Sequence, residues 1–183
     1  MKNNKIAVSL LTLCFAVLFS TVSHAQTNYD KIVADAADAK AAFIKIDASM
    51  ADLFSKSYGY VIFPNVGKGA FIIGGAGANG VVYENGAQIG TAKLRQVSVG
   101  LQAGGQTYRE VIFFEDEDAM FRFKENKVEF SGQVSAVAAK SNASANAKYT
   151  DGVQVYTEGK NGLMLEASVG GQKFYYKGLE DAE

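Results

Sequence analysis

The chain has 183 residues, of which 18 are basic and 19 are acidic, so its formal net charge is −1 at pH 7. This balance is not that of a nucleic-acid-binding protein, which needs an excess of basic residues. A single cysteine excludes an internal disulfide, so stability must come from a packed core, and the length suffices for one such domain.

The first 25 residues have the pattern of a secretory signal peptide. Two lysines precede an apolar run over residues 6–19, and small residues lead to an expected cleavage site after Ala25. Cleavage would remove Cys14 and His24, the only cysteine and histidine in the chain. The sequence therefore predicts a periplasmic or secreted protein with no Ser-His-Asp triad, no cysteine nucleophile, no metal site and no cofactor.

Residues 26–183 are expected to form one domain, because no linker divides them. Residues 29–57 contain no glycine and are rich in alanine, which favours helix. Asp47 or Ser49 is expected to cap a second short helix. Apolar residues recur at spacings of three and four, which predicts a helix packed on a sheet. A helix lying on a membrane surface is the alternative, but aspartates offset its lysines. The apolar stripe comprises Ile32, Ala36, Ala39, Phe43 and Ile46.

Residues 58–86 read as three short strands. Aromatic and β-branched residues predict strands at 58–63, 70–73 and 80–83. We expect Pro64-Asn65 to end the first strand, because proline has no N–H for the ladder. Asn85-Gly86 between apolar runs predicts a tight hairpin.

Three glycines in this stretch match the dinucleotide-binding fingerprint. Gly75, Gly77 and Gly80 have its spacing, but that motif needs a helix after the last glycine. Val81, Val82 and a tyrosine follow instead, which is typical of a strand. The glycines are therefore expected to mark a bulge, a bend or a close approach rather than a nucleotide site.

The second half of the chain continues as strands. They are expected at 97–102, 108–114, 134–147, 153–158, 163–169 and 173–177. Acidic residues at 115–118 favour the start of a short helix, with a carboxylate or cation site as the alternative. The fold class is therefore α+β: an antiparallel β-barrel or strongly bent sheet of about eight or more short strands, with N-terminal helices and one short internal helix.

A series of short motifs occurs between about residue 34 and residue 177: Gly59-x-x-Ile62-x-Pro64, Lys68-Gly69, Gly74-Gly75-x-Gly77, Gly80-Val81, Gly100-x-Gln102-x-Gly104, Gly132, Tyr149, Gly162-Leu163, Gly170 and Tyr175-Tyr176. Their order and spacing together resemble the SYLF domain family. Two segments depart from the usual family pattern. Ile89-Gly90-Thr91-Ala92 stands where the family usually has Trp-Ser-x-Pro, and Ala138-Ala139-Lys140 replaces a Gly-Pro-x-Gly-Arg type segment.

The resemblance implies a non-enzymatic lipid-binding module. Eukaryotic members are associated with phosphoinositide-rich membranes and a yeast branch with actin. The two departures favour a general phospholipid or membrane surface as the partner, rather than a polyphosphorylated headgroup. An envelope structural or protein-interaction domain is the alternative, and a hydrolase using Glu110, Glu115 or Asp116 is a third.

Phosphate headgroups are bound by basic side chains beside backbone amides and apolar surface. An ordinary solvated surface position is the alternative for each candidate. Tyr58, Tyr60, Tyr175 and Tyr176 are expected to form either an amphipathic rim or part of the core. The candidate lipid-binding residues are Lys56, Lys68, Lys93, Arg95 and Arg109.

Overall fold

The computed structural model describes residues 28–67, 75–97, 107–127, 129–130, 137–138, 148–159, 162–166 and 172–179. The chain forms two compact units, residues 1–34 and 35–183, and the described residues of the first, 28–34, are helical. The predicted signal peptide, the strand at 70–73, and most of the strands at 97–102 and 134–147 lie outside the described residues.

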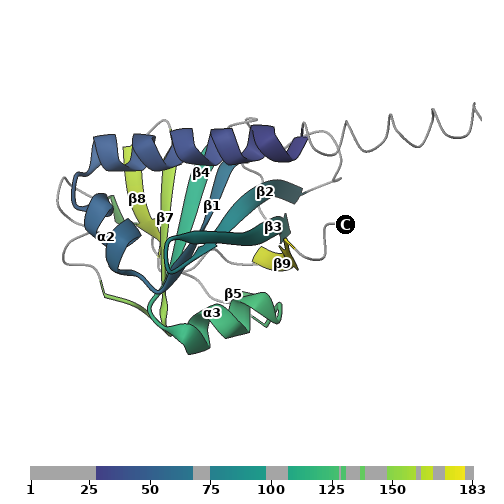
Figure 1. Ribbon diagram of the computed structural model, residues 1–183. Helices are drawn as coiled ribbons and strands as arrows, with labels where there is room; N and C mark the ends of the chain where they lie inside the picture. The colour runs from purple at the N-terminus through teal and green to yellow at the C-terminus, as the bar shows by residue number, and fades with distance from the viewer. Residues whose placement is uncertain are drawn as a thin grey trace, which may run out of the picture. The chain divides into compact units, whose positions relative to one another are not determined.

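The second unit is built on one antiparallel sheet in the order β5-β9-β3-β2-β1-β4-β7-β8-β6 (Figure 1). The α+β class and the antiparallel sheet are therefore confirmed. Closure into a barrel is not confirmed, because no pairing joins the end strands β5 and β6 within the described residues. The elements are a first helix over residues 28–46, α2 (Met50–Lys56), β1 (Gly59–Val66), β2 (Gly75–Glu84), β3 (Ala87–Val97), β4 (Tyr108–Phe114), α3 (Glu117–Lys124), β5 (Glu129–Phe130), β6 (Val137–Ala138), β7 (Val153–Gly159), β8 (Gly162–Glu166) and β9 (Gln172–Gly178).

One face of the sheet, the concave face, curls around an apolar core. Phe63 of β1 and Phe174 of β9 lie with ring centroids 5.9 Å apart, although β2 and β3 lie between their strands. Phe123 of α3 packs 4.9 Å from Phe114 and 5.7 Å from Phe174, which fills the space inside the curl. These contacts support the strongly bent sheet that was predicted.

The opposite, convex face is covered by helices over β1 and β4. Phe54 of α2 makes edge contacts with Tyr60 at 5.0 Å and Phe113 at 4.9 Å. Lys40 of the first helix donates a hydrogen bond of 3.0 Å to the Tyr60 hydroxyl, and its stripe residues Ala36, Ala39 and Phe43 are fully buried. The predicted packing of a helix on the sheet is confirmed for residues 35–46. No described helix is long and apolar enough to cross a membrane.

The glycine-rich stretch is a strand and not a nucleotide-binding turn. Gly75, Gly77 and Gly80 all lie within β2. A Cβ on Gly80 would lie 2.6 Å from the Phe63 ring and 2.7 Å from the Ile62 carbonyl oxygen. Glycine at position 80 therefore permits the close approach of β2 to β1. Asn85 and Gly86 have φ values of 49° and 79°, which confirms the tight hairpin.

One local expectation is wrong and one strand was missed. Pro64-Asn65 does not end the first strand, because β1 continues to Val66 past a register shift between Phe63 and Val66. A proline is tolerated at such an irregularity because the ladder is already interrupted there. No separate strand was predicted for β3, which covers Ala87–Val97.

The predicted cap of α3 is confirmed, whereas the predicted cap of α2 has a different geometry. Asp116 caps α3 by accepting a hydrogen bond of 2.8 Å from the Ala119 N–H, as the acidic run indicated. Ser49 occupies the N-cap of α2 but makes no side-chain cap bond. Instead, the Asp47 carboxylate accepts from the Ser49 N–H at 2.9 Å and its hydroxyl at 2.6 Å. Asp47 therefore shapes the turn between the two helices.

Replacement of Gly80 by alanine should destabilise the protein. The added methyl group would meet the Ile62 carbonyl oxygen, a backbone atom that cannot move without disturbing β1. We expect the free energy of unfolding, measured by urea titration, to fall by about 1–3 kcal/mol.

Gly159→Ala is the matched control, because a Cβ there would lie 3.7 Å from the Tyr108 Cβ, an ordinary contact. Equal unfolding midpoints for the two variants would show that the close approach at Gly80 does not require glycine.

Candidate functional site

The outer side of β3 and β9 carries a group of basic side chains. Leu94 of β3 and Phe174 of β9 belong to the concave core, and successive strand residues point to opposite faces. Their neighbours therefore lie on the convex face, where they are exposed. We call this group the basic strip, and it comprises Lys93, Arg95, Lys173, Tyr175 and Lys177.

The register between the two strands sets these side chains side by side. Lys93 is paired with Tyr175, and Arg95 with Lys173. Cross-strand partners in such a ladder have Cβ atoms roughly 5 Å apart. The Arg95 guanidinium lies over the Tyr175 ring, 5.6 Å from its centroid. This contact holds one cation beside an aromatic ring that is 44% exposed.

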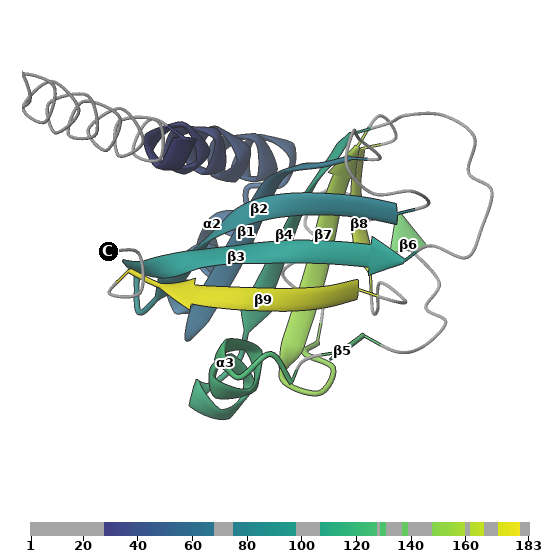
Figure 2. The same cartoon turned by 90° about the vertical axis from the view of Figure 1, so that its right-hand side faces the viewer.

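Within the described part of residues 35–183, no helix covers this part of the sheet. Figure 2 shows β3 and β9 facing the viewer, whereas α2 and β1 lie behind them. The outward described positions of the two strands, Thr91 included, hold no acidic residue. The convex face is thus apolar and covered over β1 and β4, and basic and open over β3 and β9.

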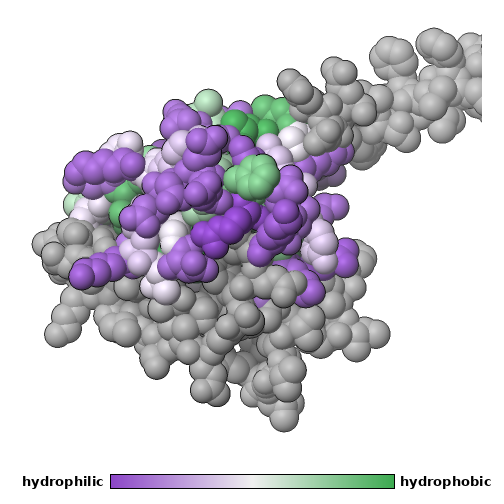
Figure 3. Space-filling model, turned by 90° about the horizontal axis from the view of Figure 1, so that it is seen from below, coloured by the Kyte–Doolittle hydropathy of each residue, from purple (hydrophilic) through white to green (hydrophobic). Residues whose placement is uncertain are grey.

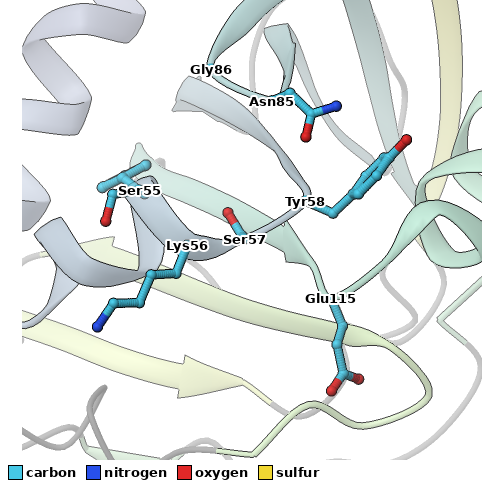
Figure 4. A pocket seen from close by; sticks show the side chains of 8 residues that line it. Ser55, Lys56, Ser57, Tyr58, Asn85, Gly86 and Glu115 are labelled. Atoms are coloured by element: carbon cyan, nitrogen blue, oxygen red, sulfur yellow. The ribbon is translucent and has the colours of Figure 1, made fainter.

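A second feature is an open polar pocket of about 440 Å³ beside the β2–β3 hairpin (Figure 4). Lys56, Ser57 and Tyr58 follow the end of α2, and Asn85 and Glu115 complete the lining. Loss of hydration, followed by a hydrogen bond with Glu84, raises the pKa of the Tyr58 hydroxyl. Tyr58 therefore stays neutral at physiological pH and is not poised as a base.

A third feature is an acidic hollow of about 590 Å³ beside α3, which Glu115 shares with the polar pocket. Two of its carboxylates have structural roles: Asp116 caps α3, and Asp151 pairs with Arg122 at 3.3 Å. Within the described part of the chain no three His, Cys, Asp or Glu side chains are grouped to hold a metal. Seen from the side of α3, the coloured surface is mostly hydrophilic (Figure 3).

The structure brings two of the predicted lipid-binding residues together and separates the others. Lys93 and Arg95 lie in the basic strip. Lys56 is exposed and forms an ion pair of 2.6 Å with Asp52 on its own helix. Arg109 of β4 is paired with Glu158 of β7. Lys68 lies outside the described residues.

Sequence reasoning missed Lys173 and Lys177 as members of the strip. The alternation of residues 172–177 contained the signal, because it places both lysines and Tyr175 on one side of a strand. Of the four predicted rim tyrosines, Tyr60 is buried, whereas Tyr175 is exposed. Tyr176 packs against the concave core and donates a hydrogen bond of 3.0 Å to the Ile89 carbonyl oxygen.

The contact between Arg95 and Tyr175 should be measurable by a double-mutant cycle. Arg95→Gln and Tyr175→Leu each remove one partner. We expect a coupling free energy of about 0.5–1 kcal/mol from urea unfolding. Tyr175→Phe keeps the ring and should keep the coupling. A coupling energy of zero would show that the two side chains do not interact in solution.

Comparison with known proteins places the chain in a family. Residues 95–180 match the family model Ysc84, described as Las17-binding protein actin regulator. The chain is also similar to Beta cell expansion factor A of Aeromonas veronii, with 31% identity over 123 residues, which cover 67% of this chain and 47% of that protein. The chain thus spans less than half the length of that curated relative. These matches confirm the resemblance predicted from the residues, and the chain belongs to the SYLF (Ysc84) domain family.

Proposed function

We propose that this protein is a non-enzymatic module of the cell envelope that binds anionic phospholipid surfaces peripherally through the basic strip. The observation that carries the proposal is the open half of the convex face. Four cations and an exposed tyrosine share it, and none of its described outward residues is acidic. A bilayer surface can contact the exposed side chains of these two adjacent strands.

The chemistry of the strip suits headgroup phosphates spread over a surface. Each lysine or arginine near an anionic bilayer contributes about 1 kcal/mol of attraction. A tyrosine beside them supplies an apolar ring with a polar tip, which suits the boundary between headgroups and acyl chains. The cations are distributed along two strands and do not converge on one pocket. This arrangement favours general anionic phospholipid over a single polyphosphorylated headgroup.

The remaining parts of the proposal rest on different observations. The matched family is named for protein binding and actin regulation and not for a reaction. The three carboxylates considered for hydrolysis have separate environments, because Glu110 is buried, Glu115 is exposed and Asp116 caps a helix. A periplasmic or secreted location follows from the predicted signal peptide, which would present the strip to an envelope membrane.

Replacing Lys93 and Arg95 together by alanine should weaken binding to vesicles of phosphatidylcholine with phosphatidylglycerol. The loss of two surface cations is worth about 2 kcal/mol, which corresponds to roughly 30-fold in affinity. Co-sedimentation at physiological salt measures this change. Wild-type binding should also weaken as salt is raised, because the charges lie at the surface.

The control variant combines Lys56→Ala with Arg109→Ala, so that the net charge changes equally. Both cations are paired within the protein and lie outside the strip, so we expect a much smaller loss of affinity. Equal losses in the two double variants would show that net charge alone matters. Wild-type protein that stays in the supernatant with every vesicle composition would favour the alternative, an envelope structural or protein-interaction domain.

A further inference from the structure

A hydrogen bond crosses the concave face between strands that are not neighbours. The Gln172 amide on β9 donates through Nε2 to Glu110 Oε2 on β4 at 2.9 Å. The strands β3, β2 and β1 lie between them in the sheet. In a flat sheet, four strand spacings would separate β4 and β9 by roughly 19 Å. The two side chains can therefore meet only because the sheet curls.

This polar pair is buried beside residues of the apolar core. Glu110 is 0% exposed and Gln172 is 1% exposed. Beside them on the same strands, Ile112 and Phe174 belong to the concave core. In such surroundings a hydrogen bond to a carboxylate is stronger than in water, and a polar group left without it is costly. Loss of either side chain would therefore penalise the curled arrangement.

The pair lies at the beginning of β9. β3 pairs with β9 along Gln172–Gly178, whereas β5 pairs only with Gln172 and Lys173. At the other end of β9, the Tyr176 N–H donates to Asn126 Oδ1 at 2.9 Å. Glu110 thus fastens the beginning of β9, next to Lys173 of the basic strip.

We infer that the Glu110–Gln172 hydrogen bond is a latch that holds β9 in the curled sheet and so positions the outward side chains of β9 against Lys93 and Arg95. Because residues alternate along the strand, the inward Gln172 and the outward Lys173 are fixed together. The effect on lipid binding rests on the proposed function, whereas the latch itself can be measured without lipid. Glu110 and Gln172 are positioning residues that need not touch lipid.

The test is amide hydrogen exchange of the complete chain without lipid. Gln172→Leu should make β9 amides exchange at least about tenfold faster, while β1 and β4 amides change less. Gln154→Leu is the matched control, because Gln154 is also buried but lies on β7, on the convex side. The double variant Glu110→Gln with Gln172→Glu exchanges donor and acceptor, and should restore protection of β9.

Each outcome decides the inference. The latch would be overturned if Gln172→Leu accelerated amide exchange equally in β1, β4 and β9, or left the exchange of β9 unchanged. It would also be overturned if the exchanged pair did not restore the protection of β9. If Gln172→Leu does not fold, the exchanged pair decides: a folded, protected β9 supports the latch, and an unfolded protein overturns it.

Vesicle co-sedimentation of the same variants tests the positioning role. With phosphatidylglycerol vesicles, Gln172→Leu should bind more weakly than Gln154→Leu, and the exchanged pair should recover. Unchanged binding despite faster β9 exchange would overturn the positioning role. Absence of binding by the wild-type protein would overturn the proposed function, and the exchange data would still decide the latch.

Discussion

The ring of Phe174 on β9 packs against the ring of Phe63 on β1, with β2 and β3 between the two strands. This contact exists because the sheet curls around Phe123 of α3. The curl depends on close approach of the strands, which Gly80 permits by having no Cβ against the Phe63 ring. Burial of these aromatic rings supplies the apolar area that a chain without disulfides needs.

The concave face of the sheet packs into the core, so the convex face is the one that can contact helices or other molecules. Helices cover that convex face over β1 and β4, where Tyr60 and Phe113 are apolar partners for Phe54. Over β3 and β9 most outward residues are basic, and no helix described within residues 35–183 lies on them. The two halves of one sheet face thus have different chemistry, and the division lies at β2.

Several charged groups outside the strip have structural roles. Asp116 caps α3, Arg122 contacts both the Asp151 carboxylate and its carbonyl oxygen, and Glu84 is paired with Lys124 of α3. Groups committed in this way are poorly placed to bind a ligand as well. A role based on a surface, and not on a reactive site, is consistent with this distribution of charge.

Local sequence determined those turns, helices and strands that depend on interactions between residues close together in the chain. The Asn85-Gly86 turn forms because both residues tolerate positive φ. Helix α3 begins where Asp116 caps it. Strand β4 is predicted by its run of aromatic and β-branched residues. The family also followed from motif order. The predicted end of the first strand at Pro64 was wrong because the β1–β4 ladder is irregular there and tolerates a proline. Local propensity does not reveal such an irregularity.

Only the tertiary structure decided which distant residues meet. Lys93 and Arg95 form a surface with Lys173 and Lys177 because β9 pairs with β3, a choice of partner across some 80 residues that no local pattern encodes. The same pairing separates Arg109 from them and gives it Glu158. Sequence fixes which face of a strand a residue occupies through the period of two, whereas strand order and curl, which depend on global packing, decide what lies beside it.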